Sequence, residues 1–359
     1  MTRTALALVA FLTLSAGFTG GVWWFAYSSA LDQLAERGRS DLSLAADRLV
    51  TQLQQFRELA VLMADHPTLI AALEGGTAAL ATASGHSAQL LCFHTLMQPG
   101  DNIVAANKLY GGSINQLNHS FKSFGWGVKW ADPADISSFE AAIDDRTRAI
   151  FIESLANPGG IVVDIEAIAA LAKAKGVPLV VDNTMATPYL CQPIEHGADI
   201  VLHSLTKFMG GHGNSMGGII VDGGSFDWSA GGKYPLLSEP RPEYQGIVLH
   251  ETFGNFAFAI ACRVLGLRDL GPAIAPMNAF LILQGIETLP LRMERHCQNA
   301  LEVAHHLKDH DKVSWVSYAG LKEDPGHALM QKISPKGAGA VFTFGLKGGY
   351  DAGVKLCNS

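Results

Sequence analysis

The sequence predicts an α/β fold with a mostly parallel sheet from residue 76 onward, and three observations carry this prediction. Short apolar segments alternate with helical stretches, 48% of the 359 residues are hydrophobic, and 38 are glycine. Strands that alternate with helices form parallel sheets covered on both faces. The glycines suit the tight turns between such elements, and the hydrophobic content argues against disorder.

Five apolar segments are expected as strands, with a helix between two of them. The helix covers residues 165–175, where apolar side chains recur at helical spacing. The strands are "NIVAAN" (102–107), "VKWAD" (128–132), "RAIFIES" (148–154), "VPLVVDN" (177–183) and "ADIVLHS" (198–204). Ligands bind beyond the carboxyl ends of such strands, so the polar residues found there are candidate site residues.

The first 75 residues differ from this pattern. No charged residue occurs between Arg3 and Asp32, and residues 4–31 are long enough to span a bilayer. We predict a membrane anchor there; a cleavable signal peptide and a buried core helix are the alternatives. Residues 31–73 carry apolar side chains at three-and-four spacing, which predicts a long amphipathic helix. Together these segments resemble the start of bacterial dicarboxylate-type sensor histidine kinases.

Charge and cysteine usage exclude several classes of function. The net charge is −7 and no run of lysine or arginine occurs, so the basic surface of a nucleic-acid-binding protein is missing. The five cysteines never stand in C-x-x-C spacing, which indicates reduced thiols and neither a disulfide framework nor a zinc site. The histidines show no metal-binding motif, and no glycine-rich nucleotide motif is satisfied.

Polar residues cluster where the last expected strand ends, in "HSLTKFMGGHG". Ser204 and Thr206 place two hydroxyl groups beside Lys207, and upstream the residues "SGH" (84–86) begin an expected helix. Free N–H groups at a helix N-terminus attract an anion such as phosphate, and nearby hydroxyls add donors to it. Taken singly, a plain helix cap and a solvated loop lysine explain the same residues.

The other strand ends supply groups that suit a flat, cationic ring. Asp182 ends an apolar strand, where its carboxylate can keep a pyridine nitrogen protonated. Tyr110 lies on a loop and offers a face for ring stacking, and Lys207 can form a Schiff base with an aldehyde. Phosphate, pyridinium, ring and aldehyde together describe pyridoxal 5′-phosphate (PLP). Taken singly, Asp182 can equally be a turn aspartate and Tyr110 a packing residue.

From about residue 73 to residue 359 the chain resembles the transsulfuration (Cys/Met metabolism) family of PLP-dependent enzymes, and within it the O-acetylhomoserine sulfhydrylase (aminocarboxypropyltransferase) branch. The resemblance implies an aspartate-aminotransferase-like (fold type I) PLP-binding domain at residues 76–285 and a truncated α/β domain at 286–359. The membrane-anchor and sensor-like helical segment expected at residues 1–75 precedes them. The matching motifs are "LEGGTAALATASGH", "VVDNTMATPYLCQPIEHGADIVLHSLTKFMGGHG", "NAFLILQGIETLPLRMERHCQNA" and "PKGAGAVFTFGLKGG", and "GGKYPLLSEPRPEYQGIVLHETFGNFAFAIACR" favours the sulfhydrylase branch.

The resemblance also implies the site residues. Backbone N–H groups and hydroxyls would hold the phosphate, Asp182 the pyridine nitrogen and Asn157 the ring hydroxyl, with Tyr110 stacked on the ring. Lys207 would form the Schiff base and would be catalytic together with Tyr110. The implied cofactor-binding set is Gly85, His86, Tyr110, Asn157, Asp182, Ser204, Thr206 and Lys207.

The activity that the resemblance implies is γ-replacement on O-acetyl-L-homoserine, in which sulfide or a thiol displaces acetate and sulfide gives homocysteine. The family also implies a cytoplasmic enzyme and a homo-oligomer. A related γ-lyase or γ-synthase is the alternative within the enzyme class. The alternative from another class is a membrane-anchored sensor fragment that carries an inactive PLP-fold passenger.

The sequence departs from the family at both flanks. Family members precede "LEGGTAAL" with a Tyr-x-Arg that reaches a neighbouring subunit's phosphate, and no Tyr-x-Arg occurs in this chain. They also carry a late arginine for the substrate carboxylate, whereas the last arginine here is Arg295. Because both family segments are missing, we expect impaired enzyme activity. The simplest account is a chimeric reading frame, in which the sensor-like segment and the enzyme segment are joined near residues 71–75. A membrane anchor would also conflict with a cytoplasmic enzyme.

Overall fold

The computed structural model describes residues 68–359 and, before them, six helical residues: Trp24, Ser28, Ser29, Leu31, Gln33 and Glu36. The chain forms two compact units, Met1–Leu62 and Met63–Ser359. Nearly all of the expected membrane anchor (4–31), amphipathic helix (31–73) and sensor-like segment (1–75) lies outside the described residues. None of the helices that the structure describes is long and apolar enough to cross a bilayer. The domain boundaries expected near residues 75 and 285 remain predictions.

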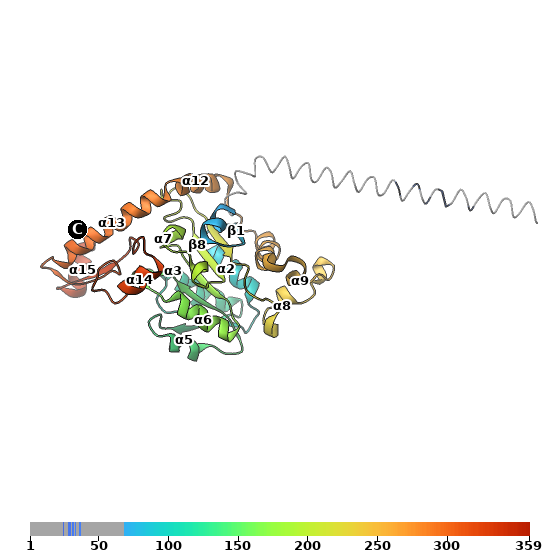
Figure 1. The fold of residues 1–359 in the computed structure, drawn as a ribbon, viewed down its shortest axis with the longest axis horizontal. Coiled ribbons are helices and arrows are strands. Elements are labelled where there is room, and N and C mark those ends of the chain that lie inside the picture. Colours follow the sequence, from blue (N-terminus) through green and yellow to red (C-terminus); the bar gives the residue numbers. More distant parts are fainter. Residues whose placement is uncertain (1–23, 25–27, 30, 32, 34–35, 37–67) are drawn as a thin grey trace, which may run out of the picture. The chain divides into compact units, whose positions relative to one another are not determined.

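A seven-stranded sheet forms the centre of the second unit, in the order β1-β9-β8-β7-β4-β2-β3 (Figure 1). Strands β2, β3, β4, β7 and β8 run parallel, and β9 lies antiparallel between β8 and β1. The mostly parallel sheet predicted from the sequence is therefore confirmed. The strands are β1 Ala78–Thr82, β2 Asn102–Ala106, β3 Gly127–Ala131, β4 Thr147–Glu153, β7 Leu179–Asp182, β8 Ile200–Ser204 and β9 Gly218–Asp222.

Two smaller antiparallel pairs lie outside this sheet. One joins β5 (Leu155–Ala156) to β6 (Ile161–Val162), and the other joins β10 (Val313–Ser317) to β11 (Thr343–Leu346). The five predicted strands are present as β2, β3, β4, β7 and β8, each within two residues of its expected ends. The sequence did not predict β9 or β1, which extend the sheet on the β8 side.

Helices surround the sheet, and α13 leads away from α12 toward α14 and α15 (Figure 1). The helices of the described part are α2 Gly85–Leu96, α3 Gly111–Asn115, α4 Phe121–Ser123, α5 Ile136–Ala142, α6 Ile165–Lys175, α7 Thr187–Leu190, α8 Pro235–Ser238, α9 Leu249–Phe253, α10 Ala257–Ala261, α11 Arg268–Leu270, α12 Pro276–Glu287, α13 Leu289–Lys308, α14 His327–Ile333 and α15 Gly349–Cys357. Shorter 3₁₀ and π turns are η1 Gln116–Ser120, η2 Pro193–His196, η3 Ala230–Gly232, η4 Pro242–Tyr244, η5 Gly254–Phe256 and η6 Cys262–Leu267.

Helix α6 covers the residues that its periodicity predicted, and local signals fix both of its ends. The Asp164 side chain accepts a hydrogen bond from the Ala167 N–H at 3.0 Å, which satisfies a free donor of the first turn. Gly176 ends the helix with φ of 62°, a left-handed conformation that glycine adopts without steric cost. Ile165, Ile168, Ala169 and Ala172 form its buried face.

The central parallel strands are buried on both faces. Residues 149–152 of β4 and 179–181 of β7 are fully buried, as the near-continuous apolar runs in the sequence indicate. Because the strands are parallel, their polar last residues meet at one edge of the sheet. Glu153 on β4 stands beside Asp182 on β7, and β8 ends next to them at Ser204.

A buried polar network ties the segment before β1 to this edge. Residues 68–74 are helical, and Glu74 is fully buried. Its Oε1 atom lies 2.5 Å from Nε2 of His203 and accepts a hydrogen bond from the Asn183 side chain at 2.9 Å. Asn183 Oδ1 in turn accepts a hydrogen bond from the Ser154 hydroxyl at 2.7 Å. The network therefore lies directly beneath the polar ends of β4, β7 and β8.

Candidate active site

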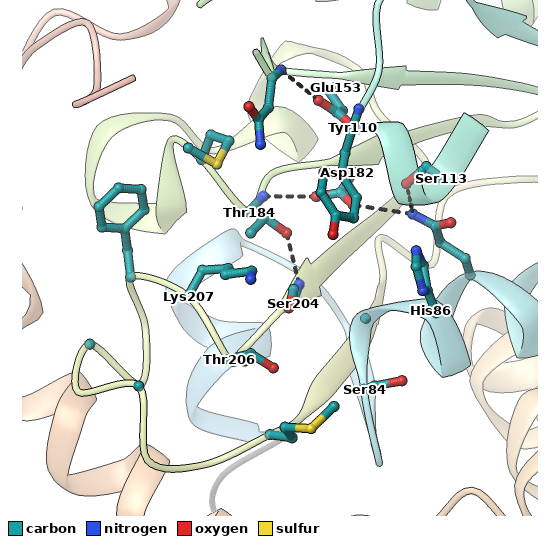
Figure 2. A pocket seen from close by; sticks show the side chains of 18 of the residues that line it. Ser84, His86, Tyr110, Ser113, Glu153, Asp182, Thr184, Ser204, Thr206 and Lys207 are labelled. Atoms are coloured by element: carbon teal, nitrogen blue, oxygen red, sulfur yellow. Dashed lines mark hydrogen bonds between the residues drawn. The ribbon is translucent and has the colours of Figure 1, made fainter. Parts of the chain in front are cut away.

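A cavity of about 620 Å³ opens at the polar edge of the sheet (Figure 2). It is bounded by the ends of β4, β7 and β8, the start of α2 and the loop after Lys207. All eight residues that the sequence nominated line this one cavity: Gly85, His86, Tyr110, Asn157, Asp182, Ser204, Thr206 and Lys207. Segments more than 120 residues apart in the sequence thus meet around one space.

The start of α2 presents free donors to the cavity. The Ser84 side chain caps the helix by accepting from the Ser87 N–H at 3.1 Å. The N–H groups of Gly85 and His86 have no hydrogen-bond partner in the part of the chain that the structure describes. No acidic residue occupies the first turn. This arrangement suits an anion, because the free N–H groups and the helix dipole both favour negative charge.

Glycine permits a close approach at this point. A side-chain carbon on Gly85 would lie 2.8 Å from Cβ of Ser204, and one on Gly218 would lie 2.1 Å from the carbonyl oxygen of Ser84. Such separations are too short for real atoms, so any larger residue would push α2 away from β8 and β9. The glycines therefore bring the N-terminus of α2 against the hydroxyl-bearing end of β8.

Two hydroxyl residues, Ser204 at the end of β8 and Thr206 in the loop that follows, are held by hydrogen bonds. The Ser204 N–H donates to Oγ1 of Thr184 at 2.7 Å, and Thr206 Oγ1 accepts from the Gly217 N–H at 3.2 Å. Lys207 follows them and is exposed to the cavity. Its ammonium group makes no hydrogen bond or ion pair with any residue that the structure describes, so it is available to a ligand.

Asp182 is fixed from two sides. Oδ1 accepts the Thr184 N–H at 2.9 Å, and Oδ2 receives a longer contact of 3.4 Å from the Gln89 amide, which also donates to the Ser113 hydroxyl at 2.8 Å. Figure 2 shows the carboxylate of Asp182 beside Tyr110 and above Ser204. Such an oriented carboxylate suits a cationic ring nitrogen.

Tyr110 and His86 form the side of the cavity next to α3. Their rings are stacked, with centroids 6.0 Å apart and planes inclined by 29°. Tyr110 is 45% exposed, so its ring is available to a planar ligand. Gly112 lies against both rings, because a side-chain carbon there would approach Tyr110 to 2.4 Å and His86 to 2.9 Å.

Sequence reasoning missed several lining residues, among them Gln89, Ser113, Thr184, Arg292 and His296. Arg292 of α13 donates to the carbonyl oxygens of Phe208 at 2.7 Å and Gly285 at 2.6 Å, and so holds the loop that follows Lys207. The periodic pattern of α13 gave no sign that this arginine turns toward the loop.

Comparison with known proteins identifies the family to which this site belongs. The family profile described as "Cys/Met metabolism PLP-dependent enzyme" matches residues 65–359. The chain belongs to this family. It is therefore a PLP-dependent enzyme, which confirms the resemblance predicted from the sequence and the predicted cofactor.

Relatives of this Cys/Met metabolism enzyme are about 50% identical to it over the aligned residues. An O-acetyl-L-homoserine sulfhydrylase from Leptospira meyeri is 52% identical over 296 residues, which are 80% of this chain and 67% of the relative. A homocysteine synthase from Schizosaccharomyces pombe is 50% identical over 292 residues, 81% of this chain and 68% of the relative.

Solved structures of the family share the fold. An O-acetylhomoserine (thiol)-lyase from Campylobacter jejuni carries a pyridoxyl-lysine phosphate adduct and is 36% identical to this chain, with a TM-score of 0.78. The match covers 82% of this chain and 73% of the Campylobacter chain. An O-acetylhomoserine sulfhydrylase from Wolinella succinogenes has a TM-score of 0.71 and 34% identity, and the match covers 80% of this chain and 77% of the Wolinella chain. The predicted fold class is thus confirmed.

The residues of the cavity fit PLP. Unpaired N–H groups and hydroxyls suit its phosphate, Asp182 suits its ring nitrogen, and the free amine of Lys207 suits its aldehyde. The carbonyl oxygen of the Gln89 side chain is buried and has no hydrogen-bond partner in the described part of the chain, so the cavity wall also holds an unused acceptor.

Proposed function

We propose that this chain catalyses γ-replacement on O-acetyl-L-homoserine, in which sulfide or a thiol displaces acetate, and sulfide gives homocysteine. The observation that carries this proposal is the placement of Lys207, Asp182 and the free end of α2 around one cavity. The similarity to the O-acetyl-L-homoserine sulfhydrylase of Leptospira meyeri and the homocysteine synthase of Schizosaccharomyces pombe supports the choice of substrate and product.

We assign the cofactor contacts residue by residue. The N–H groups of Gly85 and His86 bind the phosphate together with the hydroxyls of Ser204 and Thr206. Asp182 pairs with the ring nitrogen, since an ion pair favours the protonated form. The ring of Tyr110 stacks on the cofactor, and Asn157 lies near the ring hydroxyl. Lys207 attaches the cofactor through its Nζ atom.

Bound PLP supplies an electron sink for carbanions that form on the amino-acid substrate. The chain then moves protons. Lys207 would hold the cofactor through Nζ, and with substrate bound its amino group would accept the proton from the α carbon of the substrate and transfer protons at the β carbon. In the net reaction the bond between the γ carbon and the acetate oxygen breaks, and a bond from the γ carbon to sulfur forms. We also assign Tyr110 a catalytic role, in addition to stacking its ring on the cofactor.

We also propose that the enzyme is a cytoplasmic homo-oligomer. All five cysteines are free thiols, and four of them are buried, which suits a reducing compartment. Met216, which lines the cavity, is exposed, and so are Met277 and Phe280 of α12 and Leu291 of α13, the last of them 71% exposed. Exposed apolar side chains of this kind suit contact with a second copy. Light scattering of the PLP-loaded protein tests this; a strict monomer would contradict it.

Borohydride reduction tests the proposed function. The PLP-loaded protein is reduced, digested and mapped, and we expect the pyridoxyl group on Lys207, with Lys207→Ala as the unlabelled control. The unreduced enzyme is then assayed for sulfide-dependent homocysteine with O-acetyl- and O-succinyl-homoserine. A label on another lysine would refute the cofactor site. Sulfide-independent release of a 2-oxo acid and ammonia would favour the γ-lyase alternative.

A further inference from the structure

Glu153 is a buried carboxylate at the cavity that the proposed chemistry does not use. It is the last residue of β4, is 3% exposed, and stands in register with Asp182 on the neighbouring strand β7. Figure 2 shows it beside Tyr110 and close to Asp182. Two carboxylates on paired residues repel each other when both are ionised, so other contacts must stabilise Glu153 at this position.

Glu153 is stabilised by hydrogen bonds from two backbone N–H groups. Its Oε1 atom accepts the backbone N–H of Tyr110 at 2.6 Å, and Oε2 accepts the backbone N–H of Asn157 at 2.9 Å. These two residues lie 47 positions apart, on separate loops. One side chain therefore fixes the loop that carries the aromatic ring and the loop that carries the amide.

The chemistry of this contact requires a carboxylate. Both partners are N–H donors, so the side chain between them must offer two acceptors and no hydrogen. Glutamate does so, whereas glutamine replaces one acceptor by an NH₂ group that would face an N–H. The two N–H bonds favour the ionised form of Glu153, whereas burial and the neighbouring Asp182 raise its pKa. The carboxylate is thus kept at an electrostatic cost.

We propose that Glu153 is a positioning residue for the cofactor ring, which it locates by fixing the Tyr110 and Asn157 loops through one carboxylate. This inference rests on the roles proposed above for Tyr110 and Asn157. Glu153 itself touches neither cofactor nor substrate in this proposal; it acts through the two residues that do.

Glu153→Gln tests the proposal, with Asp222→Asn as the matched control. Asp222 is also a buried carboxylate that accepts two backbone N–H groups, from Gly224 at 2.9 Å and Ala259 at 3.2 Å, but it lies at the opposite edge of the sheet. We expect the Kd for PLP, from a visible-absorbance titration, to rise about tenfold or more in E153Q, which corresponds to about 1.4 kcal/mol. The circular dichroism of the bound cofactor should weaken as well. In D222N both should match the wild type.

Hydrogen exchange provides a readout that does not depend on activity. In the cofactor-free wild type we expect slow exchange at the amides of Tyr110 and Asn157, and in E153Q at least one of them should exchange at least tenfold faster. If E153Q does not fold, Glu153→Asp replaces it, because it keeps the charge but withdraws both acceptors by one methylene. It should shift the same readouts.

The failures of the two proposals are distinguishable. A wild type that acquires no PLP on Lys207 would refute the proposed function. A wild type that is loaded at Lys207, together with E153Q showing a Kd within twofold and an unchanged dichroism band, would refute the positioning role alone. Fast exchange at both amides in the wild type would refute it without any variant. Equal effects in E153Q and D222N would reduce Glu153 to a general stabilising residue and so overturn the inference.

Discussion

Replacing Asp222 by asparagine should remove a pH dependence from the stability of this protein. Asp222 ends β9, is 2% exposed, and accepts hydrogen bonds from two backbone N–H groups. Burial raises the pKa of its carboxyl from an ordinary 3.8 to about 6. The native state therefore binds a proton here more tightly than the unfolded chain does.

The sign of the pH dependence follows from this difference in pKa between the native and unfolded states. Well below pH 4 the carboxyl is protonated in both states and contributes no difference. As the pH rises, the unfolded chain ionises first, and the native state loses stability until the pH passes about 6. One pKa unit corresponds to about 1.4 kcal/mol, so the complete loss is about 3 kcal/mol. Roughly half of it falls between pH 5 and pH 8, because the unfolded state is already ionised at pH 5.

Urea unfolding at pH 5, 6.5 and 8, followed by tryptophan fluorescence under reducing conditions, measures this loss. The asparagine side chain in D222N keeps an acceptor for the Gly224 N–H but places an NH₂ group against Ala259, which costs the variant an amount that does not depend on pH. Relative to the wild type, D222N should therefore gain about 1.4 kcal/mol from pH 5 to pH 8. A difference between the two proteins that stays constant over this range would refute the reasoning.

Three further substitutions give sharp expectations. Asp182→Asn keeps the acceptor for the Thr184 N–H but loses the charge, so steady-state turnover should fall at least tenfold and by more than PLP affinity falls; full activity would exclude the pyridinium role. Arg292→Lys can reach only one of the Phe208 and Gly285 carbonyls, so the free energy of unfolding should drop by about 1 kcal/mol in urea titrations, which corresponds to the one hydrogen bond that is lost. Ser84→Ala removes the cap of α2 and should cost about 1 kcal/mol, which appears as a lower Tm; an unchanged Tm would show that the cap is replaceable.

The sequence predicted those parts of the structure that depend on local pattern. The five parallel strands and α6 follow from runs of apolar residues, and Ser84, Asp182 and Lys207 were found because a strand or helix ends beside each of them. Parallel strands end at the same edge, so polar residues at these ends had to meet there. For this reason all eight nominated residues line the cavity.

The missed features depend on long-range geometry. Glu153 was visible at the end of a strand, but its partners are backbone N–H groups, which carry no signature in the sequence. Arg292 reaches the loop after Lys207 from a helix 85 positions further along the chain. Strand β9 runs antiparallel and completes the sheet between β8 and β1, and only pairing in three dimensions reveals this.

The buried Glu74–His203 contact decides where this protein can be shortened. A recombinant form that starts at Met63 keeps the helical residues 68–74. One that starts at Gly76 removes Glu74, so Nε2 of the buried His203 loses its partner and the Asn183 amide keeps only its bond to the Cys191 carbonyl. These two residues are the immediate neighbours of Ser204 and Asp182 in the chain. A truncation at Gly76 removes none of the predicted site residues, but it would destabilise the strand ends that carry Ser204 and Asp182. Recombinant forms should therefore begin upstream of Ile70.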